Sequence, residues 1–240
     1  MKKIRFSRLA SRVGLICQLG LIGLIGLMLF APALRAATPA GRGAVIERDT
    51  AGDGWRRLFS ALAARGATFS EFVEKRHFST RKEPVVLRGE MRLVPERGLS
   101  LRYTEPEETL TIIDAQGIFL RDARGRARQI KAGTRDAGLV TALLPVMRFD
   151  EENLFGQFTI HAARDGGNGD GGDWRLDFVP RNEKLAEALG AIVVTGSGAE
   201  IKTIGFNTSP KLRVEVVVGE NKPGAVFTED EMGKYFRAAK

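Results

Sequence analysis

Short segments in which apolar and polar residues alternate dominate this chain from residue 69 onward, and they constrain its fold more than any other feature. In residues 99–104, Leu99, Leu101 and Tyr103 fall on one side of a strand and polar side chains on the other. No βαβ alternation appears, so the pattern predicts one antiparallel sheet of about ten strands. The predicted strands are 69–78, 85–93, 99–104, 109–113, 117–120, 127–131, 158–162, 174–179, 191–195, 201–206 and 212–218.

Helices are predicted at both ends of this strand series and in its middle. The first presents Leu58 and Leu62 on one face, and the last opens on the capping box Thr228-Glu-Asp-Glu231. The second is expected to stop near Pro145, because proline breaks helix interiors. The predicted helical segments are 53–66, 137–144, 150–155, 182–189 and 228–236.

The N-terminus has the pattern of a secretory signal peptide. Five basic residues in the first 12 precede an uncharged apolar run to Phe30, and small residues follow it. Cleavage is expected after Ala33 or Ala36, and the alternative is a retained membrane anchor. We therefore expect a signal peptide at 1–36, a flexible leader at 37–52, one folded domain at 53–240, and export to the periplasm of a Gram-negative type envelope.

The net charge of +8 comes mostly from this N-terminal segment. Residues 1–36 hold six of the 37 basic residues and none of the 29 acids, so the remainder carries +2. Such a balance argues against a nucleic-acid partner. The single cysteine, Cys17, lies in the apolar run and excludes a disulfide framework or a cysteine-based zinc site.

No catalytic constellation is found, so we expect no enzyme, no cofactor and no metal. His77 and His161 each lie in a predicted strand without a second ligand at metal spacing, and Gly196-Ser-Gly198 reads as a hairpin turn. The stretch 165–173 does not match a calcium loop, and a flexible hairpin loop is the better interpretation. The basic cluster Arg121, Arg124, Arg126 and Arg128 reads as solvated hairpin charge or as a docking surface for anionic headgroups or an acidic partner.

The alternating strands leave a large apolar face that short helices must cover. From the residues alone, that face is either a filled core or, where the cover is incomplete or mobile, an apolar pocket. Five motifs, taken in their order along the chain, favour the apolar pocket. They are Phe69-Ser-Glu-Phe-Val-Glu-Lys-Arg76, Leu87-Arg-Gly-Glu-Met-Arg-Leu93, Leu99-Ser-Leu-Arg-Tyr-Thr-Glu-Pro106, Leu110-Thr-Ile-Ile-Asp-Ala-Gln-Gly-Ile-Phe119 and Trp174-Arg-Leu-Asp-Phe-Val-Pro180. Their order and spacing resemble the LolA superfamily of periplasmic lipoprotein carriers over residues 55–218.

This resemblance implies a mostly β (α+β) fold, in which a strongly curved antiparallel half-barrel carries a helical lid over an apolar cavity. It implies a monomeric carrier that takes acyl chains of a lipid or lipoprotein from an inner-membrane donor complex to an outer-membrane acceptor. Val94 and Leu101 stand where lipoprotein carriers usually show a basic residue and a tryptophan, which favours divergent LolA-like relatives associated with glycolipid or aryl-polyene export.

Strand parity and helical spacing assign side chains to this cavity. The expected cavity wall comprises Met91, Leu93, Leu99, Leu101, Tyr103, Leu110 and Ile112, and the expected lid comprises Leu58, Leu62, Leu139 and Leu143. The alternative function is an envelope interaction module with a filled core and no lipid cargo.

Overall fold

The structure of the chain is a computed structural model that describes residues 43–49, 51–132, 134, 138, 142–164 and 172–238, with only the backbone at Ala188. All of these residues belong to one compact unit, Pro39–Lys240. The predicted signal peptide at 1–36 lies outside the described residues, as do residues 37–42 and 50 of the predicted leader.

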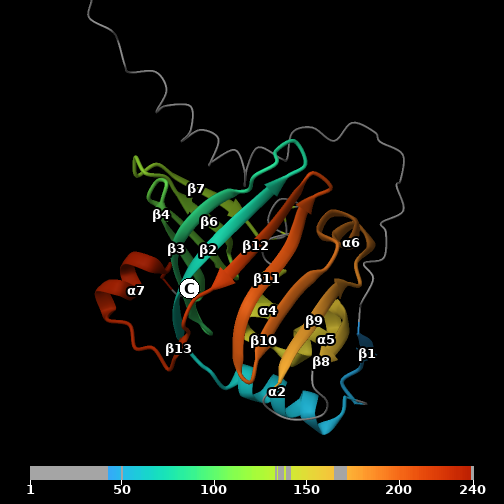
Figure 1. Cartoon of the computed structure of the whole chain (residues 1–240). Coiled ribbons are helices and arrows are strands. Elements are labelled where there is room, and N and C mark those ends of the chain that lie inside the picture. Colours follow the sequence, from blue (N-terminus) through green and yellow to red (C-terminus); the bar gives the residue numbers. More distant parts are fainter. Residues whose placement is uncertain are drawn as a thin grey trace, which may run out of the picture. The chain divides into compact units, whose positions relative to one another are not determined.

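One antiparallel sheet organises the described chain (Figure 1). It has 13 strands, and its main path runs β1-β8-β9-β10-β11-β12-β2-β3-β4-β5-β6-β7 with β13 beside β2. The described strands thus end at β1 on one edge and β7 on the other, so the sheet is open, and the predicted antiparallel fold is confirmed. The strands are β1 (Ala44–Ile46), β2 (Thr68–Phe78), β3 (Val85–Val94), β4 (Gly98–Glu105), β5 (Thr109–Asp114), β6 (Gly117–Arg121), β7 (Ala127–Lys131), β8 (Phe158–Arg164), β9 (Asp173–Pro180), β10 (Ile192–Ser197), β11 (Glu200–Ser209), β12 (Leu212–Val218) and β13 (Lys222–Pro223).

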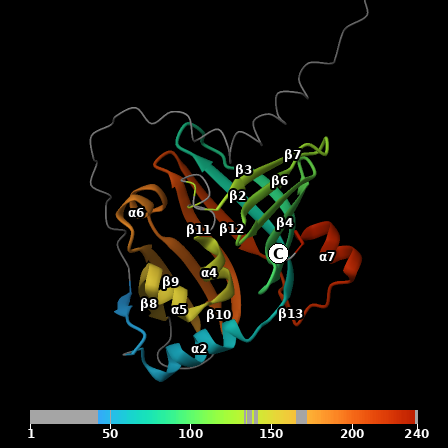
Figure 2. The ribbon, with the colours of Figure 1, turned by 180° about the vertical axis from the view of Figure 1, so that it is seen from behind.

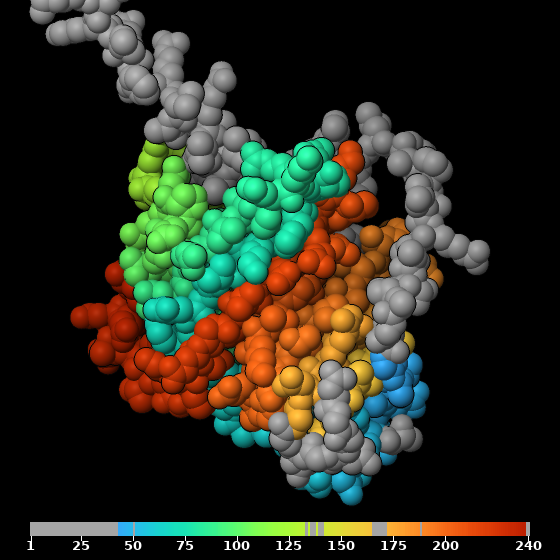
Figure 3. All heavy atoms as spheres, viewed as in Figure 1, coloured from blue at the N-terminus to red at the C-terminus, as the bar shows by residue number. Residues whose placement is uncertain are grey.

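Successive side chains along each strand point to opposite faces of the sheet, and different segments pack on the two faces. We call the face that carries Phe72 and Glu74 of β2 the inner face, and the face that carries Phe69 and Val73 the outer face. In Figure 2, α4 and α5 lie in front of β8–β11, on the inner face, and α2 runs along the lower ends of these strands. Figure 3 shows the opposite side, where β2, β12 and β11 run side by side at the surface.

The helices are short, and most begin at a residue that can cap them. Asp150 accepts a hydrogen bond from the Asn153 amide, Asn182 accepts one from the Leu185 amide, and Thr228 forms the predicted capping box with Glu231. Among the residues that the structure describes, no helix combines the length and apolarity needed to cross a membrane. The helices are α2 (Asp53–Ala63), α4 (Leu143–Arg148), α5 (Glu151–Gln157), α6 (Glu183–Leu189) and α7 (Glu229–Tyr235).

Two expectations about local structure are wrong. Helix α4 contains Pro145 as its third residue instead of stopping there. This is compatible with helix geometry because amide groups in the first turn have no acceptor within the helix. Residues 44–46, expected in a flexible leader, form edge strand β1 because they pair with β8, where Val45 lies opposite His161.

Candidate functional site

Five of the predicted wall residues share the inner face of β3 and β4. The register pairs Met91 with Leu101 and Leu93 with Leu99, while Tyr103 lies opposite Gly89. Met91, Leu93, Leu99 and Tyr103 are buried, with exposed fractions of 2–7%, and Leu101 is half-buried. These residues form a continuous, largely apolar surface on the inner side of the sheet, which we call the inner wall.

Leu110 and Ile112 lie on the outer face, so their assignment to the inner wall is wrong. The register pairs Leu110 with Arg102 and Ile112 with Ser100, both outer-face residues, and places Thr111 and Ile113 on the inner face instead. Leu110 and Ile112 pack with Tyr235 and Phe236 of the C-terminal segment. A change of one residue in register inverts every side chain of a strand, and the alternation in 109–113 does not fix which parity faces inward.

A buried polar group lies on the inner face beside the wall. Tyr103 Oη donates a hydrogen bond of 2.7 Å to Glu74, and Arg76 Nε donates one of 2.5 Å to the other oxygen of that carboxylate. Glu74 is flanked by Leu87 and Val216 on the neighbouring strands. Charges are buried in proteins when they are paired, as here.

Sequence reasoning did not identify this group, because Glu74 and Arg76 lie on one strand and Tyr103 on another, and only the folded sheet brings them together. The signal that could have revealed it is parity, because Glu74 and Arg76 share the parity of the buried Phe72. Burial raises the pKa of Tyr103 well above its usual value, and the nearby charge of Glu74 raises it further. The phenol therefore stays protonated and can donate to the carboxylate.

The predicted lid residues that the structure describes come from two helices. Leu58 and Leu62 of α2 and Leu143 of α4 are all buried. The Phe59 ring of α2 lies 5.8 Å from that of Phe149, which contacts Phe178 of β9 at 6.4 Å. These contacts hold α2 over the inner face at the β8–β11 half. Leu139 lies outside the described residues, and whether these helices act as a lid stays a prediction.

The four arginines of the predicted docking surface do not share one face. Arg121 pairs with Ala127 on the outer face, whereas Arg128 pairs with Leu120, whose side chain packs with Ile118 and Ile130 on the inner side. Arg124 and Arg126 lie in the turn between β6 and β7, where Arg126 forms an ion pair of 2.6 Å with Asp122. Their role in docking stays a prediction.

A family model described as "Outer membrane lipoprotein carrier protein LolA-like" matches residues 52–219. The match covers α2, the inner wall, the buried polar group and the strands through β12. It ends before β13 and α7. Among curated proteins, none matches the sequence significantly.

Several solved structures are similar in fold at low sequence identity. One is a putative outer membrane lipoprotein-sorting protein domain from Vibrio parahaemolyticus, at 10% identity and TM-score 0.41, covering 76% of this chain and 95% of that one. Another is a LolA superfamily protein from Nitrosomonas europaea, at 8% sequence identity and TM-score 0.39. The match covers 73% of this chain and 97% of that one. A third is the MucA/MucB complex of Pseudomonas aeruginosa, at 16% and 0.38, where the match covers 75% of this chain and 59% of that chain.

Proposed function

Because the chain belongs to the LolA-like family of outer membrane lipoprotein carrier proteins, we propose that it is a periplasmic carrier for the acyl chains of a lipid or lipoprotein. The inner wall is the observation that carries this proposal. Met91, Leu93, Leu99, Leu101 and Tyr103 bring together largely apolar surface from two adjacent strands, without charged side chains between them. An acyl chain laid along this surface would replace contacts with water by contacts with leucine and methionine.

The proposed activity is binding without chemical conversion. Burying one methylene group contributes about 0.8 kcal/mol, so about ten buried methylenes contribute roughly 8 kcal/mol before the costs of association are subtracted. Release at the outer membrane then requires an acceptor whose own site is more favourable for the acyl chain. An inner-membrane donor complex and an outer-membrane acceptor are the partners that this cycle needs.

The burial of the inner wall sets a condition on this cycle. Leu99 is 2% exposed and Met91 and Leu93 are each 5% exposed, so the packing over these side chains must open before an acyl chain can reach them. The polar end of a ligand could bind to the Glu74, Arg76 and Tyr103 group only by replacing hydrogen bonds that these side chains make with one another. The proposed lid is formed by α2 and α4, because they place Leu58, Leu62 and Leu143 in the core next to the sheet.

The same burial favours a second candidate function, an envelope interaction module whose inner face is simply filled core. The two candidates differ in one measurable property, which is the uptake of an acyl chain. Native mass spectrometry of protein purified from periplasm without detergent tests it directly. A co-purifying acyl mass supports the carrier, whereas a clean apo mass without uptake of a fluorescent fatty-acid probe supports the filled core.

A pair of substitutions locates the binding surface. Leu101→Glu places a charge on the inner wall, and Val86→Glu places the same charge on an outer-face position of β3 that is 44% exposed. We expect Leu101→Glu to abolish probe binding and Val86→Glu to leave it within about twofold, because charged groups are costly to bury. Circular dichroism confirms folding of both variants. Equal probe binding by Leu101→Glu and the unmodified protein would refute the proposed wall.

A further inference from the structure

The C-terminal segment 220–238 lies beyond the matched family region and packs on the outer face of the sheet. Strand β13 pairs with β2, where Lys222 lies opposite Phe69. Helix α7 follows and places Tyr235 against Leu110 and Ile112 of β5. In Figure 1, α7 lies outside the sheet next to β3, on the side away from α2, α4 and α5. This segment therefore adds a wall that the matched region alone does not contain.

Specific contacts fix α7 on this face. The Arg92 guanidinium lies 3.9 Å from the centre of the Tyr235 ring, and Arg237 forms an ion pair with Asp114 in which Nε lies 2.6 Å from Oδ2. Arg97 Nη2 also donates a hydrogen bond of 2.7 Å to the Arg237 carbonyl. With both Tyr235 and Phe236 buried, these contacts hold the helix at a defined position relative to β3–β6.

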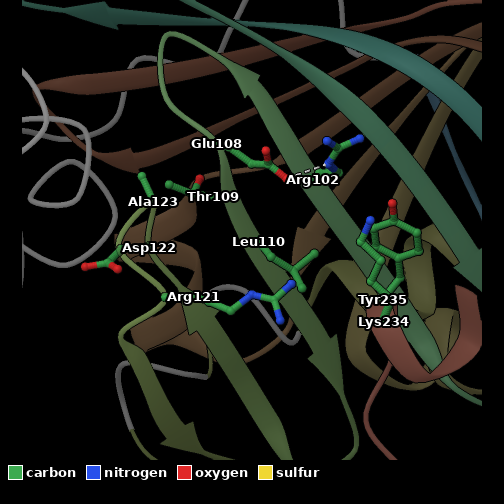
Figure 4. Close-up of a pocket in the computed structure, with 10 residues that line it drawn as sticks. Arg102, Glu108, Thr109, Leu110, Arg121, Asp122, Ala123, Lys234 and Tyr235 are labelled. Atoms are coloured by element: carbon green, nitrogen blue, oxygen red, sulfur yellow. Dashed lines mark hydrogen bonds and ion pairs between the residues drawn. The ribbon is translucent and has the colours of Figure 1, made fainter. Parts of the chain in front are cut away.

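A pocket of about 220 Å³ opens between α7 and the outer face of β4–β6 (Figure 4). Its floor is a cross-strand row of Arg102, Leu110 and Arg121 from three consecutive strands. Lys234 and Tyr235 of α7 form its opposite side. In Figure 4 the Arg121 side chain extends across the sheet toward Leu110.

The pocket has an excess of positive charge. Its lining contains Arg102, Arg121 and Lys234 against the acids Glu108 and Asp122. Both acids are already paired, since Glu108 accepts a hydrogen bond of 3.0 Å from Arg102 and Asp122 holds Arg126 of the adjoining turn.

Two of the pocket's cations remain available. Within the described residues, neither Arg121 nor Lys234 has an acid at ion-pair distance, and the ammonium of Lys234 lies 5.1 Å from the Tyr235 ring. These two cations reach the pocket from different elements, β6 and α7, with Leu110 between them on the floor.

We propose that this pocket binds a phosphoryl group. A guanidinium presents a planar fork to two phosphate oxygens, and an ammonium from the opposite side suits a third. The volume is below the roughly 300–1,000 Å³ of pockets that enclose drug-sized ligands, which suits a phosphate ester with a small substituent. Such a group is found in a phospholipid headgroup or in a free phosphate ester, and either source presents the same chemistry.

Calorimetric titration of the protein with inorganic phosphate and with glycerol 3-phosphate tests the site. Arg121→Gln and Lys234→Gln should each weaken binding by at least about tenfold, because each removes one charge-assisted contact. Lys184→Gln on α6 is the matched control, since it removes a charge at an exposed position far from the lining residues. We expect the control to stay within about twofold of the unmodified protein, because a distant surface charge is screened by salt.

Vesicle flotation distinguishes the two sources. If phosphatidylglycerol vesicles bind, phosphatidylcholine vesicles do not, and Arg121→Gln removes the binding, the ligand is a lipid headgroup. If only the soluble esters bind, with the same sensitivity to Arg121→Gln, the ligand is a free phosphate ester. Absence of phosphate binding in every experiment overturns the proposal. An equal loss of binding affinity in Arg121→Gln, Arg124→Gln and Lys184→Gln also overturns it, because it indicates that the anion is attracted by the overall positive charge and not by this pocket. Uptake of the fatty-acid probe should be unchanged in Arg121→Gln, so the result does not depend on the carrier function.

Discussion

The ion pair between Arg237 and Asp114 should stabilise the C-terminal segment measurably. Arg237 donates from Nε and Nη2 to the two carboxylate oxygens, and Nη2 also donates to the Gly117 carbonyl at 3.1 Å. The side chains are 15% and 10% exposed, so solvent screens the pair only weakly. Hydrogen bonds to charged groups contribute about 1.5–3 kcal/mol each. Removing the arginine loses this contribution and leaves the buried carboxylate without a compensating charge. We therefore expect Arg237→Gln to lower the free energy of unfolding by about 2–3 kcal/mol.

Urea denaturation, with hydrogen exchange of the amides in 225–238, measures this effect. Arg126→Gln is the matched control, because Arg126 also pairs with an aspartate at a β-turn but is 65% exposed. Its partner Asp122 is only 8% exposed but keeps hydrogen bonds from the Arg124 and Arg126 amides, so removing the exposed guanidinium should cost no more than about 1 kcal/mol. A double-mutant cycle with Asp114→Asn should give a coupling energy of about 2 kcal/mol. A coupling near zero, or equal losses in Arg237→Gln and Arg126→Gln, would show that burial of Tyr235 and Phe236 alone holds the segment.

Three further predictions follow from burial, backbone and charge. Leu176→Ala removes a fully buried side chain from β9 and should cost about 2–5 kcal/mol in urea denaturation. Gly117→Ala should lower the melting temperature, because φ is +111° and a Cβ would lie 2.2 Å from the Ile130 carbonyl oxygen; a substitution without effect would contradict this turn geometry. Burial alone would raise the pKa of Glu90, but hydrogen bonds and charges from two neighbouring arginines outweigh it and lower the pKa. Its stabilising contribution should be present above about pH 4.3 and lost as the pH falls through the lower folded-state pKa. Glu90→Gln should therefore flatten the loss of stability on acidification, and an unchanged acid limb would contradict the assignment.

Local patterns in the sequence predicted most elements of the fold because the signals are themselves local. The alternation of residues 99–104 specified β4, and the capping box at Thr228 specified the start of α7. Pro145 was misinterpreted because its effect depends on its place within a helix, and α4 begins two residues earlier than the proline.

The candidate site was predictable only where parity could be anchored. In β4 the polar and apolar residues separate cleanly, so Leu99, Leu101 and Tyr103 were assigned to the correct face. In β5 the adjacent Ile112 and Ile113 are both apolar, and both prove to be buried, on opposite faces. The sheet is covered on both sides at this point, so hydrophobicity alone cannot indicate which side is inner.

The sequence by itself determined the class of the fold and the family. Period-two alternation, turn residues and the absence of βαβ units leave an antiparallel sheet, and the order of the motifs identifies the LolA-like family. Only the tertiary structure decided where the charges lie. Glu74 and Arg76 are buried beside the inner wall, and Arg121 meets Lys234 across an outer pocket although 112 residues separate them in the chain. Such contacts depend on strand register and on the docking of α7, which are set by packing between distant segments and not by the local sequence.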